Sequence, residues 1–443
     1  MKRNLLLLGL LLCWLPALRS GYFWDDRSLI LQNPALGDLS AIFGQDLAHR
    51  EGAAATPFYR PMMLLSLSVD QLLAPANPLF AHLHSLGWHL LGVALLGSLV
   101  QRRLGEEAAL GAMLIFGLHP IQSEAVLWLS ARNDPMVAAG VVGALLCFDR
   151  GSWLGGGLLA LFAGLSKEQA LLLPVALPLW RLSFGERPRW VDTAVAALAA
   201  GLVFVLRSRA DVLAVQPSEV HLQLFSERWL LLPSTVLGWL LVPWPLTSSA
   251  SLYQPLPGIL PLLLALLSII GLVGLLIRER QNAGLVGLAL LFFAPAAVAV
   301  AATTLIGERY LYLPVAFLAV GVGRVLPLRL VGLGALLLLP LLELRLWQWS
   351  SEAELTEVAA TQLPDAYTRY RLAVLREAQG DPKAAFRLYL DSVQSDPPFL
   401  GSCAPPVRLL KQVAAEAPAR KLFEDLSPIC KDRPDFQALG SAP

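Results

Sequence analysis

Two adjacent carboxylates, Asp25 and Asp26, follow directly on the first apolar stretch of the chain, in the run Phe-Trp-Asp-Asp. Lys2 and Arg3 precede that stretch, and the positive-inside rule keeps such a basic end in the cytoplasm. We therefore expect the acidic pair to emerge on the opposite side, just beyond the hydrocarbon. Neighbouring like charges split each other's pKa values, which suits one of the two carboxylates to accept a proton. The alternative is a solvated interfacial pair without a chemical role.

Other ionisable and aromatic residues recur at the same expected membrane depth, in the loops on the side of the aspartates. The cations are Arg60, Arg132, Lys167 and Arg309, and their polar or aromatic companions are His82, His89, His119, Glu124, Asp134, Glu168, Glu308 and Tyr310. Such residues are costly near a bilayer and usually functional. Carboxylates mixed with cations suit an anionic, polar ligand carried in lipid. The structural alternatives are loop-holding ion pairs, helix caps and an interfacial aromatic belt.

Local spacing places several of these residues on helices. His82 and His89 lie seven apart, so they share one helix face. Asp134 directly before Pro135 predicts a helix N-cap followed by a first-turn proline. Each pattern fixes where a helix begins and which side chains point the same way.

Lys167 has an unusual expected position. Ser166 and Gln169 have the spacing of a capping box, so a helix should begin there. Lys167 would then lie at the positive end of the helix dipole, where a cation is unfavourable. A residue placed against its local preference usually has another role, and for a lysine that role is anion binding.

The elements that must position these loops are membrane helices. The chain has 443 residues, of which 56% are hydrophobic and 15% charged, with a mean hydropathy of +0.59. Such a composition predicts an all-α integral membrane protein. The net charge of +1 and the lack of a basic stripe argue against nucleic-acid binding. Apolar runs predict about 11 spans. They fall near 4–20, 82–100, 106–120, 135–149, 152–165, 168–182, 191–207, 258–277, 283–303, 310–324 and 329–347.

Charge orients these spans. The run 229–244 is broken by two prolines, Pro233 and Pro243. If it does not cross the membrane, the arginine-rich turns all face the cytoplasm, which is the better positive-inside solution. We therefore expect 229–244 to be interfacial or re-entrant, the N-terminus to be inside, and the C-terminal tail to be outside. Residues 1–347 would form the membrane domain and residues 348–443 an extracytoplasmic helical domain.

The tail changes abruptly to a soluble composition. Its small and aromatic positions between 366 and 398 match a tetratricopeptide helix-turn-helix. A single repeat cannot bury its own face, so it must pack on the segments before and after it. Cys403 and Cys430 could pair if this tail is extracytoplasmic.

The motifs taken together resemble a known family. They are Trp24-Asp25-Asp26, Tyr59-Arg60-Pro61, His82 with His89, His119-Pro120 with Glu124, Arg132-x-Asp134, Ser166-Lys167-Glu168 and Glu308 to Pro314. In this order, over about 1–397, they resemble the transmembrane and tetratricopeptide-repeat protein O-mannosyltransferases of the GT-C class. The resemblance implies a lipid monophosphate-linked sugar donor, transfer to a protein hydroxyl outside the cytoplasm, and an essential acid in the first outer loop. Ser85 replaces the family's Asn, and one repeat stands where relatives often carry an array.

The chemistry that follows is a metal-independent, inverting transfer without a cofactor. Asp25 or Asp26 would accept the proton of a Ser or Thr hydroxyl as it attacks the anomeric carbon. The four cations would stabilise the phosphate leaving group, and His119, Glu124 and Glu168 would orient them or the sugar. Mannose is the expected sugar. The donor lipid would be dolichyl- or undecaprenyl-type, and the tail would contact a secreted or membrane protein acceptor.

Arginine far outnumbers lysine in the chain, which suggests a GC-rich bacterial genome, an inner-membrane location and a periplasmic active site. Three other functions remain open from the sequence. A GT-C enzyme acting on a lipid or envelope glycan would share all the membrane chemistry. A transporter would keep its ionisable residues near the bilayer centre, between inverted repeats. A non-catalytic assembly scaffold would tolerate replacement of the acidic pair.

Overall fold

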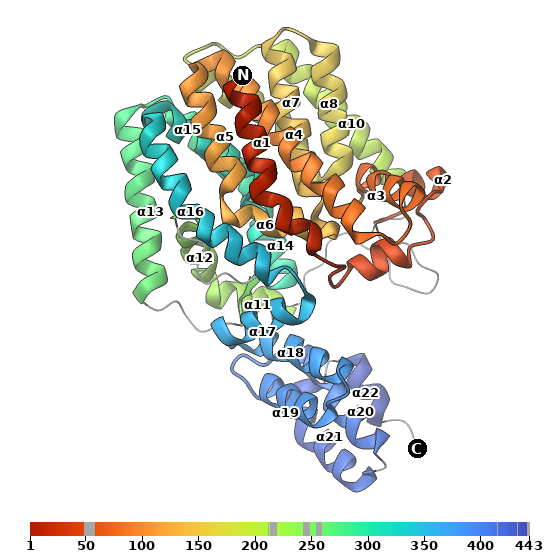
Figure 1. The fold of residues 1–443 in the computed structure, drawn as a ribbon. Helices are drawn as coiled ribbons and strands as arrows, with labels where there is room; N and C mark the ends of the chain where they lie inside the picture. Colours follow the sequence, from red (N-terminus) through yellow and green to blue (C-terminus); the bar gives the residue numbers. More distant parts are fainter. Residues whose placement is uncertain are drawn as a thin grey trace.

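The computed structural model describes residues 1–47, 58–210, 212, 219–241, 249–253, 259–413, 415–431 and 433–440. Nearly all of this part is helical, as expected (Figure 1). A bundle contains the N-terminus at one end, and a smaller group of helices, α17–α22, extends from the other end.

The long elements of the bundle are α1 (Lys2–Trp14), α3 (Pro61–Leu73), α4 (Pro78–Leu104), α5 (Glu106–Leu118), α7 (Asn133–Asp149), α8 (Trp153–Ser166), α9 (Leu173–Leu182), α10 (Trp190–Arg209), α13 (Ile259–Arg278), α14 (Asn282–Thr303), α15 (Tyr312–Val325) and α16 (Leu328–Gln348). Shorter elements connect them. These are η1 (Leu15–Arg19), η2 (Arg27–Leu31), α2 (Leu39–Gly44), η3 (Pro120–Gln122), α6 (Ser123–Leu127), η4 (Leu129–Ala131), η5 (Glu168–Leu172), α11 (Glu219–Arg228), α12 (Leu231–Leu241) and η6 (Glu308–Leu311).

The longest helix, α4, shows how the sequence sets the boundaries. Asn77 caps its start by accepting a hydrogen bond from the Phe80 amide at 3.3 Å, and Pro78 fits the first turn. Gly105 ends it with a φ of 88°, which a residue without a Cβ adopts freely. The chain therefore turns sharply from α4 into α5.

The expected number of about 11 spans is not confirmed. Five helices of the described residues are long and apolar enough to cross a membrane, namely α4, α10, α13, α14 and α16. The count is six if α5 and the following 120–127, bent by 54°, form one span. The other predicted spans coincide with helices that are too short by this criterion, such as α8 with 14 residues. Segment 229–244 contains the short apolar helix α12, and its residues 242–244 lie outside the described part.

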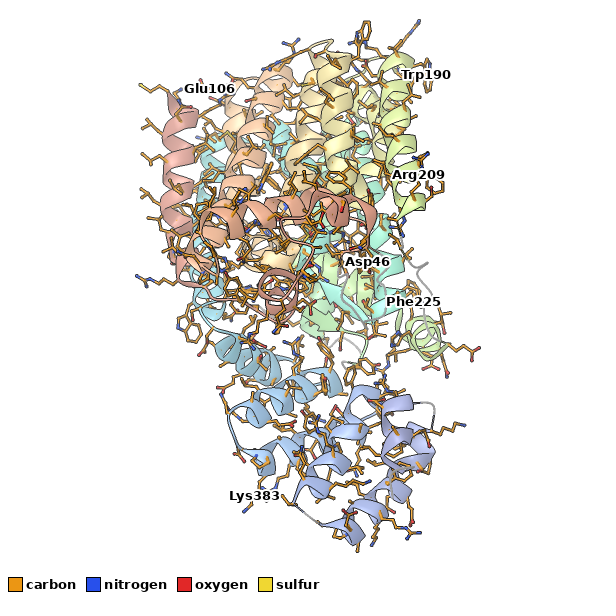
Figure 2. All side chains as sticks on the ribbon, turned by 90° about the vertical axis from the view of Figure 1, so that its right-hand side faces the viewer. Asp46, Glu106, Trp190, Arg209, Phe225 and Lys383 are labelled. Atoms are coloured by element: carbon orange, nitrogen blue, oxygen red, sulfur yellow. A yellow bond between two sulfur atoms is a disulfide. The ribbon has the colours of Figure 1, made fainter. Side chains whose placement is uncertain are left out.

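A basic network ties together the bundle end farthest from the tail. Arg103 pairs with Asp149 and Glu186, and Arg181 pairs with Glu186 at 2.7 Å and with Asp192 at 3.3 Å. In Figure 2, Glu106 and Trp190 mark this end and Lys383 marks the tail at the other. Arg103 and Arg181, which lie close to turns expected to face the cytoplasm, are therefore joined at this end of the bundle. The side of the membrane on which they lie stays a prediction.

Close helix packing in the bundle relies on small residues. A Cβ on Gly140 of α7 would lie 2.8 Å from the Cβ of Ala163 on α8, which is closer than two such atoms can approach. The buried contact between these two helices therefore requires glycine at this position.

The tail consists of α17 (Glu352–Gln362), α18 (Ala366–Ala378), α19 (Pro382–Val393), η7 (Leu400–Ser402), α20 (Ala404–Gln412), α21 (Glu416–Cys430) and α22 (Pro434–Gly440). Helices α18 and α19 pack against each other through Ala373, Ala385 and Tyr389, all of which are buried. This agrees with the expected small and aromatic packing positions, whereas the tetratricopeptide assignment stays a prediction. Cys403 and Cys430 form a disulfide, here called the tail disulfide.

Two three-residue strands connect the bundle to the tail. Strand β1 (Ser249–Ser251) pairs antiparallel with β2 (Leu305–Gly307), which runs directly into η6. The Ser251 hydroxyl donates a 2.7 Å hydrogen bond to Asp365, the capping residue of α18. This small sheet therefore fixes α18 close to the segment that carries Glu308 and Arg309.

Candidate active site

Residues 20–27, here called the acidic loop, follow η1 and contain Asp25 and Asp26. The backbone of this loop turns at a strained residue. Trp24 has a φ of 45°, in the left-handed region that only glycine occupies readily. For a bulky residue this conformation costs on the order of 1–3 kcal/mol and persists only where the surroundings impose it. The surroundings here are aromatic: the Trp24 ring meets Trp128 at a centroid distance of 5.3 Å and Trp349 at 5.6 Å.

The structure gives Asp25 and Asp26 opposite environments. Asp26 is completely buried, and its carboxylate accepts hydrogen bonds from the Ser130 amide (2.7 Å), the Ser130 hydroxyl (2.5 Å) and the Phe23 amide (3.0 Å). Burial raises the pKa of Asp26 to about 7, against the opposing effect of these hydrogen bonds. Asp25 is exposed, and its carboxylate has no hydrogen-bond or ion-pair partner among the described residues.

A pKa near 7 would suit Asp26 to act as a general base, but its carboxylate is not accessible to a substrate hydroxyl. A base must reach the hydroxyl proton that it removes, and a completely buried carboxylate with three protein donors cannot. Asp25 is free to do so. The geometry therefore makes Asp26 the residue that holds the loop and leaves the Asp25 carboxylate accessible from outside the protein.

Three of the four predicted cations form ion pairs that belong to one network. Arg60 pairs with Glu168 at 3.1 Å, Lys167 pairs with Asp134 at 2.5 Å, and Arg309 pairs with Glu124 through both its side chain and its amide. All six of these residues were singled out from the sequence. They come from α3, α7, the α8–η5 turn, η6 and α6, which the tertiary fold brings to one place.

Aromatic contacts and charge link this network to the acidic loop. The guanidinium of Arg309 lies 4.9 Å from the ring centroid of Trp128, which in turn contacts Trp24. Burial lowers the pKa of Lys167, and the positive charges of Arg60 and Arg309 lower it further, whereas Asp134 opposes the change. Lys167 has one described acceptor for its three donors, so it retains donors for an anion.

Arg132 lies in a different environment from the one expected of a phosphate ligand. It is completely buried, pairs with Asp70 at 2.5 Å, and donates to Ser85 (2.9 Å), Ser66 (3.2 Å) and the Ala81 carbonyl (2.8 Å). A guanidinium with this many protein acceptors offers little to a ligand. Arg132 instead anchors the segment that contains Ser130, and so supports Asp26 indirectly.

The three predicted histidines are buried and bonded to nearby protein groups. His82 contacts the Gly21 carbonyl at 2.9 Å, His89 the Tyr312 hydroxyl at 2.6 Å, and His119 the Leu240 carbonyl at 3.3 Å. His82 and His89 do share one face of α4, as the spacing predicts. These partners lie in the segment before Asp25, at the start of α15 and on α12, so the three histidines join neighbouring elements of the bundle. No group of three or more His, Cys, Asp or Glu side chains in the described ranges is arranged to hold a metal ion.

Glu308 is separated from the exposed part of the site. It is buried and pairs with Arg345 of α16 at 2.6 Å. Burial raises the pKa of Glu308 to about 8, although Arg345 lowers it. Tyr310 lies beside Arg309, whose guanidinium is 4.9 Å from its ring. Glu308 thus fastens η6 to α16, while the next two residues face the ion-pair network.

Two local predictions were wrong. Helix α7 begins at Asn133 with Arg132 as its N-cap, so Asp134 lies in the first turn. Its carboxylate forms an ion pair with Lys167 and does not cap the helix. Ser166 does not begin a helix: it ends α8, and its hydroxyl bonds back to the Phe162 carbonyl. In both cases a tertiary contact or an existing helix took precedence over a short capping pattern.

Sequence reasoning missed Asp70, Ser130 and Arg345, which complete the buried part of the site. Asp70 is the only charged residue of the apolar helix α3, and Arg345 lies with Arg329 and Glu343 in the apolar helix α16; charges within apolar helices are a signal that could have been used. Ser130 had no distinguishing pattern, because its role depends on its distance from Asp26.

The part of the chain that the structure describes is mostly helical, has five or six helices long and apolar enough to span a membrane, and carries an acid–base cluster beside its tail. Comparison with known proteins confirms the resemblance expected from the motifs. The chain is 26% identical over 143 residues to the human protein O-mannosyl-transferase TMTC3 and 27% identical over 147 residues to mouse TMTC1. It is 26% identical over 196 residues to the Caenorhabditis elegans protein O-mannosyl-transferase F38B6.6.

These matches are partial. They cover 31% of the chain and 16% of each mammalian relative, and 40% of the chain and 27% of the nematode relative. No protein-family model matches the chain, and no solved structure matches it.

Proposed function

We propose that this protein is an integral-membrane glycosyltransferase of the GT-C class that transfers a sugar, with mannose the expected one, to Ser or Thr hydroxyls of proteins. The donor is a polyprenyl monophosphate sugar, and transfer takes place outside the cytoplasm. One observation carries the proposal: an exposed aspartate, Asp25, is held by a buried neighbour next to a network of cations. The names of the relatives support the reaction class.

In the proposed reaction Asp25 accepts the proton of the acceptor hydroxyl. The hydroxyl oxygen forms a bond to the anomeric carbon as the bond from that carbon to the phosphate oxygen breaks. The electron pair of the broken bond leaves with the lipid monophosphate, so charge balances without a cofactor. Attack opposite to the leaving group inverts the anomeric configuration.

The leaving phosphate gains charge as the bond breaks, and fixed cations stabilise that charge. Lys167 and Arg309 are the proposed phosphate ligands, because they lie close enough to interact electrostatically and their side chains keep 9% and 18% exposure, whereas Arg132 keeps none. Arg60 adds positive charge beside them. Asp134, Glu124 and Glu168 hold the three cations in place before substrate arrives.

The tail and the names of the relatives support a protein acceptor. The tail helices α17–α22 extend from one end of the bundle, where Arg371 of α18 contacts Trp24 beside Asp25 (Figure 1). Tetratricopeptide-like helical modules generally bind polypeptides. A bacterial inner membrane with a periplasmic active site is the proposed location.

The test is sugar transfer in vitro. Purified protein in nanodiscs is given undecaprenyl- or dolichyl-phosphate mannose labelled in the sugar and a Ser/Thr-containing peptide. We expect Asp25→Asn to lower kcat by at least 100-fold, the usual size of a lost general base, with unchanged thermal stability. Asp391→Asn, at an exposed position of α19, is the matched control and should transfer at the wild-type rate. Wild-type turnover by Asp25→Asn would refute the assignment.

A lipid or glycan acceptor is separated from a protein acceptor in cells. Mass spectrometry of envelope proteins and envelope glycans from a deletion strain shows which class loses a hexose. Loss confined to glycans would overturn the proposed acceptor while leaving the membrane chemistry intact.

A further inference from the structure

We infer that Arg371, on the tail helix α18, is a positioning residue for the acidic loop, so that the tail is part of the reaction centre and not only a recruiting module. This inference rests on the proposed function, because Arg371 would act through Asp25.

The tail contacts the acidic loop on both sides of the aspartate pair. Before the pair, the Arg371 guanidinium lies 4.5 Å from the ring centroid of Trp24. After the pair, Arg27 forms an ion pair at 3.3 Å with Glu352 of α17. Glu352 also approaches Arg371 at 3.9 Å, so one carboxylate joins the two contacts. Asp25 therefore projects from a short segment fastened at each end to the tail.

The first contact falls on the residue whose conformation aims Asp25. The left-handed backbone of Trp24 is unfavourable and needs support from its surroundings. The rings of Trp128 and Trp349 pack edge-on against the Trp24 ring. The guanidinium of Arg371, from the tail, lies over the Trp24 ring. A guanidinium over an indole is a favourable cation–π arrangement. Of these three contacts with the Trp24 ring, only the one from Arg371 comes from the tail, and replacing Arg371 removes it.

The join between bundle and tail is rigid enough to transmit this contact. Trp349, which directly follows α16, is completely buried and packs edge-on against Phe23 at 5.0 Å. Only three residues separate α16 from α17. At the start of α18, the capping residue Asp365 accepts a hydrogen bond from Ser251 of the small sheet. Helix α18 is thus tied to the bundle at both the linker and the sheet.

The two possible roles of the tail, recruiting the acceptor or positioning Asp25, predict different kinetics. A tail that only recruits acceptor would change KM for long acceptors and leave kcat for a short peptide untouched. A tail that positions Asp25 must change kcat even for an acceptor too short to reach it, and must leave KM for the lipid donor unchanged.

The experiment compares Arg371→Ala with Arg376→Ala in nanodiscs, using a short Ser/Thr peptide and the lipid-linked sugar. Arg376 is the matched control: it is on the same helix and pairs with Glu357 at 3.0 Å, not with the loop. We expect Arg371→Ala to lower kcat roughly three- to thirtyfold with donor KM unchanged. Arg371→Lys should recover part of kcat, and Arg376→Ala should match the wild type. Arg371→Gln replaces the alanine variant if that variant fails to fold.

A second measurement does not depend on turnover. With the two free cysteines, Cys13 and Cys147, replaced by serine and the tail disulfide kept, Arg27→Cys with Glu352→Cys should be joined by a short bismaleimide reagent, because the ends of the two native side chains lie 3.3 Å apart. Failure to cross-link would overturn the docked geometry. Wild-type kcat in Arg371→Ala, with Asp25→Asn inactive, would overturn the inference and leave the proposed function standing. Wild-type kcat in Asp25→Asn would instead overturn the proposed function.

Discussion

Replacing Ser130 by alanine tests how the acidic loop is held. The change removes the hydroxyl that donates to Asp26 at 2.5 Å and leaves the Ser130 amide, which donates to the same carboxylate at 2.7 Å. A hydrogen bond to a charged group contributes about 1.5–3 kcal/mol, and one to a neutral group about 0.5–1.5 kcal/mol. The cost of Ser130→Ala should therefore depend on whether Asp26 is ionised.

The pKa of Asp26 sets the pH at which this cost changes. Burial raises the pKa from an ordinary 3.8 to about 7, so the folded protein holds this proton more tightly than the unfolded chain. The stabilising contribution is complete below about pH 4 and disappears as the pH rises through 7. At pH 5 Asp26 is protonated and at pH 9 it is ionised. Ser130→Ala should therefore cost about 1 kcal/mol more at pH 9 than at pH 5.

The assay is the free energy of unfolding in mixed micelles at pH 5 and pH 9, followed by tryptophan fluorescence. Ser28→Ala is the matched control, because the Ser28 hydroxyl donates to the Asp25 carbonyl, which does not titrate. Its cost should be equal at both pH values. Equal costs for Ser130→Ala at pH 5 and pH 9 would show that Asp26 does not titrate in this range or does not depend on Ser130.

Three further outcomes are expected. Gly140→Ala should lower the free energy of unfolding by about 1–3 kcal/mol, because its Cβ would collide with Ala163, whereas Gly201→Ala, which meets open space, should change it by less than about 1 kcal/mol. Arg345→Gln leaves Glu308 buried without its cation and should cost about 3–5 kcal/mol in the same assay; an effect below 1 kcal/mol would contradict the pairing. The tail disulfide spans 27 residues, so its reduction should destabilise the tail by about 3 kcal/mol and speed proteolysis of α20–α22; an unchanged cleavage rate would contradict this.

The apolar pattern predicted the helices, whereas the number of about 11 spans is not confirmed. Every predicted span coincides with a helix, yet several are too short to cross a membrane by themselves. Helix α7 illustrates the reason: 15 of its 17 residues are buried by other helices of the bundle. A helix surrounded by protein and a helix surrounded by lipid are both apolar on all sides, so composition alone does not distinguish them.

Residue types and spacing selected the six members of the ion-pair network, although not Asp70, Ser130 or Arg345, because charged groups stand out in an apolar chain. Glu124 with Arg309 and Asp134 with Lys167 were all chosen from the sequence, and the structure pairs them. The partner of each group was not predictable, since these pairs join residues 185 and 33 positions apart.

The sequence by itself determined an almost wholly helical chain, a change to a polar tail after residue 347, the shared face of His82 and His89, and a resemblance to protein O-mannosyltransferases. These properties depend on local periodicity, composition and residue identity. Only the tertiary structure decided that Asp26 is enclosed and Asp25 exposed, that Arg132 is occupied by Asp70, and that the tail reaches the acidic loop. Accessibility and charge pairing are set by segments distant along the chain, which local patterns do not encode.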